Sequence, residues 1–350
     1  MTSTKKIIEQ GEFSSLPETV ELDHGTGAKL SRELVELIAG TLGDSYLGVM
    51  EDSALLELPS NKVAFTTDSF VVTPLFFGNG DIGKIAVCGT VNDLAVSGAK
   101  PLYITLSLII EDGMRIDDLL QIISSVRDAA NMSGVKIVAG DTKVVAEGDA
   151  DQLFINTAGI GVLERTPMSC RNIRSGQKII LSGYIGNHSI HLLSIREGLG
   201  FERNVLSDCA PLNHLIERVL ENIPDGKVVS MRDVTRGGLS AVLHEHARAT
   251  NNTILFYKKN LPILPEASMA ADMLGVDLIN LANEGCLCLF VEPEYADKVL
   301  SLLREDPLGV NASIIGEVGS ENQPEVHMIE LDGTLKNIEE LYGAELPRLC

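Results

Sequence analysis

Short apolar strand-like segments alternate with longer helix-like segments from about residue 62, and this alternation constrains the fold more than any other feature. The pattern is typical of α/β domains, in which helices cover a sheet. The segments expected in the first half are strand 63–67, helix 82–95, strand 102–110, helix 117–132, and strands 136–139 and 153–163. Asp117 is placed to cap its helix and Gly134 to end it.

A second α/β unit follows the stretch 166–176, whose Pro, Ser, Arg and Gly residues indicate a domain boundary. Its expected segments are strand 178–182, helices 189–197 and 211–222, strand 228–231, helices 238–250 and 265–274, strand 286–291, helix 293–304, strand 312–318 and a last helix near 335–341. With 350 residues, the chain exceeds one comfortable core. We therefore expect an arm (1–45), an N-terminal domain (46–165), a C-terminal domain (175–334) and a mobile tail (335–350).

The composition excludes several classes of function. A formal net charge of −21 argues against a nucleic-acid partner, because phosphate binding needs a basic face. The start of the chain lacks an apolar signal region, and no segment approaches the length of a membrane span. The six cysteines form no framework, and Cys286 and Cys288 are expected on one face of a strand. These features predict a cytoplasmic protein with reduced thiols and no membrane association.

Acidic residues interrupt otherwise apolar segments and are expected at or near their ends. The residues concerned are Asp52, Asp68, Asn92, Asp93, Asp141 and Asp233. Carboxylate and amide oxygens are the ligands that Mg²⁺ takes when it bridges nucleotide phosphates. Asp68 alone is equally explained as a turn cap. The pair Asn92-Asp93 is more telling, because it interrupts a helix whose apolar residues indicate burial, and a buried carboxylate must be paired or bound to metal.

Glycines accompany two of these acidic motifs. Gly237 and Gly238 follow Asp233 and open a helix, where backbone N–H groups can approach an anion, although a structural turn explains the spacing as well. The arm carries His24-Gly25-Thr26-Gly27, which is too short to establish phosphate binding. No Walker A sequence is present. Any ATP binding would therefore rest on carboxylates and metal.

The chain as given ends on Cys350, preceded by Pro347-Arg348-Leu349. A terminal thiol on a tail could be loaded by one catalyst and presented to another, as in a carrier. Pro347 stiffens the approach by fixing φ and biasing Leu346 toward extended conformations. A frayed terminus that happens to end in cysteine is the plain alternative.

Together these motifs resemble the superfamily that includes aminoimidazole ribonucleotide synthetase, selenophosphate synthetase and thiamine-monophosphate kinase, and within it the HypE family of NiFe-hydrogenase maturation proteins. The resemblance covers nearly the whole chain from about residue 22. The residues that carry it are 24–27, 68–70 with 74–77, 82–90 leading into 92–99, 140–145, 153–159, 232–238, 283–285 and 347–350. Ala28 departs from the family's usual second glycine after Gly27, and Leu349 stands where isoleucine is commoner.

The resemblance implies an ATP-dependent carbamoyl dehydratase. A separate carbamoyltransferase would load Cys350 with a carbamoyl group, ATP would activate the amide oxygen, and loss of water would leave a protein thiocyanate. The cyano group would then pass to iron on a scaffold complex during NiFe-hydrogenase maturation. Lys143 and Glu284 would flank the modified cysteine as electrostatic stabiliser and general base. The residues implied in binding ATP and Mg²⁺ are Asp52, Asp68, Asn92, Asp93, Asp233, Asp141, Gly25 and Gly27, with Asp52, Asp68, Asp93 and Asp233 as metal ligands.

The resemblance also implies a two-lobed α/β (α+β) fold of the aminoimidazole ribonucleotide synthetase type and a homodimer whose N-terminal sheets form a shared barrel. We expect the tail to take an outward and an inward position, with Gly343 as pivot. Two rivals remain. Another synthetase or small-molecule kinase of the superfamily would turn over a free substrate without Cys350. A non-catalytic adaptor would show no ATP hydrolysis.

Overall fold

The computed structural model describes residues 17–47, 53–320 and 323–341. Its N-terminal domain is built on a four-stranded sheet in the order β1-β4-β2-β3. The β1–β4 and β4–β2 pairs are antiparallel, and β2–β3 is parallel. Its elements are β1 Val63–Phe70, α3 Ile82–Val96, β2 Lys100–Glu111, α4 Ile116–Ser133, β3 Lys136–Val145 and β4 Leu153–Val162, preceded by α2 Lys29–Leu42.

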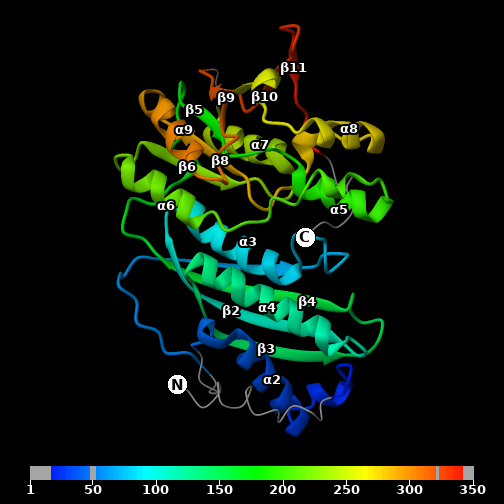
Figure 1. Ribbon diagram of the computed structural model, residues 1–350. Coiled ribbons are helices and arrows are strands. Elements are labelled where there is room, and N and C mark those ends of the chain that lie inside the picture. The colour runs from blue at the N-terminus through cyan, green and yellow to red at the C-terminus, as the bar shows by residue number, and fades with distance from the viewer. Residues whose placement is uncertain (1–16, 48–52, 321–322, 342–350) are drawn as a thin grey trace.

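The C-terminal domain holds a seven-stranded sheet in the order β11-β10-β7-β9-β5-β8-β6, with helices packed around it (Figure 1). Its strands are β5 Lys178–Leu181, β6 Val228–Asp233, β7 Ile254–Tyr257, β8 Leu287–Val291, β9 Ser313–Val318, β10 Val326–Ile329 and β11 Leu335–Asn337. Its helices are α5 Asn187–Glu197, α6 Asn213–Asn222, α7 Gly238–Thr250, α8 Pro265–Leu274 and α9 Ala296–Arg304. The mixed α/β architecture predicted from the sequence is confirmed.

Helix α3 joins the two domains. Nearly all of its side chains are buried, as the apolar pattern of 82–95 predicts. Its N-terminal part belongs to the core of the N-terminal domain, whereas Ala95 and Val96 pack with residues of α6, β8 and α9. Figure 1 places α3 between the two halves, below α6. The helix therefore fixes whatever side chains it carries at the domain junction.

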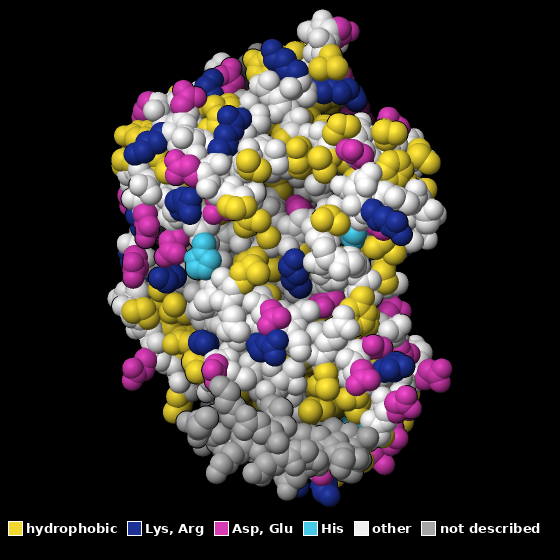
Figure 2. All heavy atoms as spheres, viewed as in Figure 1, with side chains coloured by type: hydrophobic (Ala, Val, Ile, Leu, Met, Phe, Trp, Pro, Cys, Tyr) yellow, Lys and Arg dark blue, Asp and Glu magenta, His cyan; other side chains and the backbone are white. Residues whose placement is uncertain are grey.

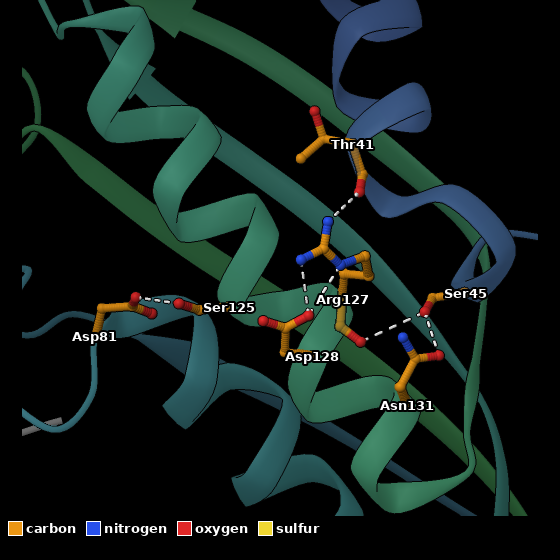
Figure 3. Close-up of polar contacts among 7 residues, drawn as sticks. All are labelled: Thr41, Ser45, Asp81, Ser125, Arg127, Asp128 and Asn131. Atoms are coloured by element: carbon orange, nitrogen blue, oxygen red, sulfur yellow. Dashed lines mark hydrogen bonds and ion pairs between the residues drawn. The ribbon is translucent and has the colours of Figure 1, made fainter. Parts of the chain in front are cut away.

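Polar contacts hold the start of α3 and the neighbouring helices in place (Figure 3). Asp81 caps α3 by accepting a hydrogen bond from Lys84 N at 3.0 Å, and the Ser125 hydroxyl of α4 donates to the same carboxylate. Burial raises the pKa of Asp81. Ser45, after α2, donates to Asn131 Oδ1 of α4 at 2.8 Å. These contacts fix α2 and α3 against α4 through side chains far apart in sequence.

Several local expectations were wrong. Asp117 lies in the first turn of α4, and Arg115 is the N-cap residue, although Gly134 does end the helix with a φ of 73°. Residues 335–341 do not form the expected helix, because β11 at the start of this stretch pairs antiparallel with β10. Strands β7 and β10 were not predicted. Asp141 lies in the middle of β3 and not near its end, whereas Asp68 does lie near the end of β1.

The surface is mixed in charge. On the face drawn in Figure 2, Lys and Arg side chains are scattered among Asp and Glu and form no continuous basic patch. Among the described residues, no helix combines the length and apolar character needed to cross a bilayer.

Candidate active site

Four carboxyl groups that are distant in sequence line one small pocket at the domain junction. Asp68 comes from β1, Asp93 from α3, Asp233 from the end of β6, and Glu284 from the segment before β8. Thr66 of β1 donates to Asp93 Oδ2 at 2.8 Å, which fixes the α3 carboxylate against the sheet. The pocket is the place where α3, β1 and β6 meet, so both domains contribute to it.

Burial and repulsion by neighbouring charges make three of these carboxyl groups, those of Asp68, Asp233 and Glu284, hard to ionise. Burial, followed by the nearby Asp93 charge, raises the pKa of Asp68 to about 6 and that of Asp233 to about 7. Burial also raises the pKa of Glu284 well above its usual range, with Asp233 and Asp208 adding to the effect. Arg236, which lines the same pocket, partly offsets the rise for Asp68. A cation would relieve this repulsion.

The donor set fits Mg²⁺ that arrives with a nucleotide. Within the described residues, no three His, Cys, Asp or Glu side chains are arranged to hold an ion by themselves. Mg²⁺ is usually bound by one or two carboxylates together with phosphate oxygens and water, so a full protein cage is not required. The raised pKa values of Asp68 and Asp233 are the observation in favour of a cation. The fourth expected ligand, Asp52, lies outside the described residues.

The Asn92 side chain is taken up by hydrogen bonds to backbone groups, among them Glu284 O at 3.5 Å. Its side chain is 2% exposed. Its Oδ1 accepts from Leu212 N at 2.7 Å, and its Nδ2 donates to Ala210 O at 3.1 Å. Asn92 does not line the acid pocket, although we expected it to bind metal or phosphate. Its contacts instead tie α3 to the segment before α6.

Glu284 is positioned by Asp208, a residue that the sequence reasoning missed. The Asp208 carboxylate accepts from Asn283 Nδ2 at 2.6 Å, Glu284 N at 3.0 Å and Gly285 N at 3.2 Å. Gly285 lets the two segments touch, because a Cβ there would lie 1.8 Å from Asp208 O. Asp208 stands in no motif that we recognised. Only its contact with Asn283-Glu284-Gly285, 75 residues or more further along the chain, reveals its role.

The remaining predicted residues line a second pocket, of about 360 Å³, between α2 and strands β2 and β3. Gly25, Gly27, Asp141 and Lys143 all contribute to its wall. Gly27 has a φ of +78°, which favours glycine. Lys143 Nζ lies 3.7 Å from Asp141 Oδ1, and both side chains are largely exposed. Within one chain, Lys143 and Glu284 therefore line different pockets.

A larger cavity of about 410 Å³ adjoins the acid pocket, because Asp93 lines both. Its walls come from β1, α3, the interdomain segment near Met168, and β6 with α7. This cavity leaves room for a substrate group beside the carboxylates. Cys350, the predicted substrate-bearing residue, lies outside the described residues.

Comparisons with known proteins match both domains of the chain. The family models of the AIR synthase related protein match at residues 50–163 for the N-terminal domain and 174–329 for the C-terminal domain. The carbamoyl dehydratase HypE of Escherichia coli K12 is 39% identical, over 95% of this chain and 99% of that protein. A crystal structure of the hydrogenase maturation protein HypE in complex with ATP is 37% identical, with a TM-score of 0.90 over 95% of this chain and 100% of that one. A HypE–HypF complex is 42% identical, with a TM-score of 0.77 over 90% of this chain and 100% of the matched chain.

Proposed function

Since this chain belongs to the HypE family of AIR synthase-related proteins, we propose that it is an ATP-dependent carbamoyl dehydratase. Its substrate is the S-carbamoyl group on its own Cys350, and its product is a protein thiocyanate that supplies the cyanide ligand of NiFe-hydrogenase iron. The observation that carries the proposal is the pocket of four carboxyl groups at the domain junction, in a chain whose full-length relatives include a HypE–ATP complex.

The reaction removes the elements of water from an amide. The amide oxygen takes the γ-phosphoryl group of ATP, so the carbon–oxygen bond breaks with phosphate as leaving group instead of hydroxide. The two nitrogen protons leave, and a carbon–nitrogen triple bond remains. Glu284 is the proposed acceptor for one proton, because a carboxylate whose pKa is raised by burial is a stronger base once ionised. Lys143 would stabilise negative charge on the reacting oxygen.

We assign Asp68, Asp93 and Asp233 to Mg²⁺ and the phosphates, together with Asp52. The ion would neutralise phosphate charge next to carboxylates that repel one another. Gly25, Gly27 and Asp141 are assigned to the nucleotide from the second pocket. The support for these roles is that Asp68, Asp93 and Asp233 line one pocket, and that Gly25, Gly27 and Asp141 line another.

A homodimer is the proposed assembly. The sheet face of the N-terminal domain that α3 does not cover carries exposed apolar side chains, among them Val63 and Phe65 of β1 and Ile109 of β2, at 47%, 68% and 40% exposure. Pairing two such faces would bury this surface. Within one chain, Lys143 and Glu284 line different pockets. In the proposed dimer, Lys143 of one copy would meet Glu284 of the other.

Mixed dimers test this arrangement. Lys143→Ala and Glu284→Gln should each accept the carbamoyl group and stall before dehydration. If the active site is shared between copies, mixing the two variants after subunit exchange restores about a quarter of wild-type activity, since half of the dimers carry one intact site. Activity that stays at the level of the single variants would contradict a shared site. Wild-type activity in both unmixed variants would contradict the residue roles themselves.

Two partners are proposed. The first is a carbamoyltransferase that loads Cys350. The crystal structure of a HypE–HypF complex of a relative supports this partner. An iron-carrying scaffold complex accepts the cyano group. Intact-mass measurement after incubation with the carbamoyltransferase, carbamoyl phosphate and ATP tests the whole proposal. The mass should rise by one carbamoyl group and then fall by one water, and Cys350→Ala should show neither change. Turnover of a free substrate by Cys350→Ala would favour a kinase or synthetase, and a stable carboxamide in the presence of ATP would favour an adaptor.

A further inference from the structure

Both ring nitrogens of one buried histidine contact backbone carbonyl groups, one from each domain. His191 of α5 is 1% exposed. Its Nδ1 lies 2.8 Å from Val205 O, in the segment between α5 and α6, and its Nε2 is hydrogen-bonded to Phe77 O, in the loop between β1 and α3. A carbonyl oxygen only accepts hydrogen bonds, so each ring nitrogen has to donate. The imidazolium form, which carries a proton on both nitrogens, is the form that satisfies both contacts.

Further polar contacts connect this clamp to the proposed base. Asn79, in the same loop as Phe77, donates through Nδ2 to Ser207 O at 2.7 Å and accepts at Oδ1 from Ser207 N at 3.2 Å. The next residue is Asp208, whose carboxylate accepts from Glu284 N at 3.0 Å. His191 therefore holds one end of the segment 205–208, and the other end of that segment positions Glu284.

The anion nearest to this ring comes from η4 Phe201–Arg203. Glu202 Oε2 accepts from the Ser194 hydroxyl at 2.9 Å, and Ser194 lies one helical turn after His191 on α5. The pKa of Glu202 is lowered by its own backbone hydrogen bond, by Ser194 and, more weakly, by the charges of Arg203 and His191. Glu202 thus attracts the charged form of the ring.

The other ionisable groups around the clamp are already engaged or lie on neighbouring elements. Arg196 Nε donates to Thr73 O at 2.5 Å, and Lys84 Nζ donates to Asn79 O at 3.2 Å, so two cations bind the loop that carries Phe77. No residue from 73 to 80 is itself ionisable. The His188 ring packs edge-on against Phe77, and its Nδ1 is hydrogen-bonded to the Ser207 hydroxyl. The remaining ionisable residues on packed elements are Asp208 and Cys209 of the segment before α6, and Glu266 and Asp272 of α8.

We propose that His191, as an imidazolium, is a positioning residue for Glu284, and that loss of its ring proton as pH rises slows dehydration. This role in dehydration rests on the proposed function; the charged clamp between the domains does not. A neutral ring keeps a single N–H, so one of the two carbonyl groups then faces a nitrogen lone pair. Either Phe77 or Val205 loses its hydrogen bond, and the segment that leads to Asp208 is held less firmly.

The position of the ring allows this proton to exchange. Gly78 is exposed, and a Cβ added there would lie 3.7 Å from His191 Nε2, so the ring lies directly beneath a surface loop. A catalytic group displaced by about 1 Å loses about 10²-fold in rate. Asn79 still ties Ser207 to the loop after the proton is lost. We therefore expect a smaller displacement of Glu284 and a loss of about tenfold in rate.

The experiment follows the ring and the reaction over the same pH range. Full-length protein labelled with ¹⁵N-histidine gives long-range ¹H–¹⁵N spectra, which report the protonation of each ring from about pH 6 to 9. Single-turnover intact mass of carbamoylated protein at saturating Mg-ATP reports the rate of dehydration. Wild type should show a His191 ring with both nitrogens protonated near neutral pH. Its rate should fall about tenfold over the interval in which this ring loses its proton.

Two variants separate a positioning role from a merely structural one. His191→Gln should lack the assigned ring signal, dehydrate about tenfold more slowly than wild type near neutral pH and show no further fall linked to that ring. Its half-saturating ATP concentration should equal that of wild type, because the clamp acts on the base and not on the nucleotide. His214→Gln, at an exposed histidine of α6, should keep both the His191 signal and the wild-type pH profile.

Each outcome bears on a separate part of the proposal. A His191 ring with a single N–H near neutral pH overturns the charged clamp. A rate profile of the same shape in wild type and His191→Gln overturns the positioning role. Should His191→Gln not fold, Gln substitutions of the other histidines assign the ring, and a wild-type rate that does not follow its titration overturns that role. If wild type never dehydrates its carboxamide, the proposed function fails, while the spectra still test the clamp.

Discussion

Gly285→Ala tests how strictly the fold holds Glu284. The added methyl carbon would lie 1.8 Å from Asp208 O and 2.8 Å from Asp208 C, both backbone atoms. Contacts this short cannot be relieved by rotating a side chain, so the two segments must separate by about 1 Å. Separation also lengthens the hydrogen bond from Gly285 N to the Asp208 carboxylate, which is 3.2 Å in the native contact.

The expected effects follow from these two changes. Overpacking of this kind costs about 1–3 kcal/mol. Loss of a hydrogen bond to a charged group adds about 1.5–3 kcal/mol. The free energy of unfolding should therefore fall by about 2.5–6 kcal/mol. Displacement of the adjoining Glu284 by about 1 Å should slow dehydration about 10²-fold.

Urea denaturation and single-turnover intact mass measure the two effects on carbamoylated protein. Gly183→Ala is the matched control, because its Cβ would meet only Leu308 O, at 3.6 Å, an ordinary contact. The control should keep the wild-type urea midpoint and rate. If Gly285→Ala unfolds and dehydrates like the control, the close approach at Gly285 does not position Glu284, and the reasoning is refuted.

Three further predictions concern the same junction. Asn92→Ala should lower the free energy of unfolding by about 2–4 kcal/mol in urea, because two buried backbone groups lose their partner; an unchanged midpoint would contradict this. Asp93→Ala should abolish Mg-ATP binding in calorimetry yet leave a folded dimer, and Mg-ATP should slow alkylation of Cys350 in wild type but not in this variant. Asp68 and Asp233, with pKa values of about 6 and 7, hold more protons folded than unfolded. Without divalent ions, the free energy of unfolding should therefore fall as pH rises from about 4 to 7, and exchanging both residues for Asn should make that slope shallower, with Glu284 supplying part of what is left.

The sequence predicted those features that depend on local pattern. The buried helix around Asn92-Asp93 could be identified because apolar residues surround two polar ones, and α7 and α8 have the expected bounds. The helix expected near 335–341 failed because a few apolar residues at helical spacing are outweighed by pairing with β10, which depends on residues elsewhere in the chain.

The arrangement of the site could be predicted less well from the sequence. Asp68 and Asp93 could be named as metal candidates, but nothing in the spacing revealed that Asn92 turns its amide toward Ala210 and Leu212. Asp208 gave no signal at all, because its partners lie on another segment. The separation of Lys143 from Glu284 depends on which strands and helices wall each pocket. Sequence motifs therefore identified most of the polar groups, and tertiary contacts decide what each group faces.

The acid pocket itself gives a reason to couple nucleotide binding to proton release. Four carboxyl groups at one junction cannot all be ionised without a compensating charge, and the raised pKa values of Asp68, Asp233 and Glu284 indicate that protons supply part of it. A bound cation would replace those protons and leave carboxylates. Ionisation of Glu284 is what its proposed role as base requires. Binding of Mg-ATP would thus also favour the ionised form of Glu284. Dehydration would then begin only when ATP and the carbamoyl group are both in place.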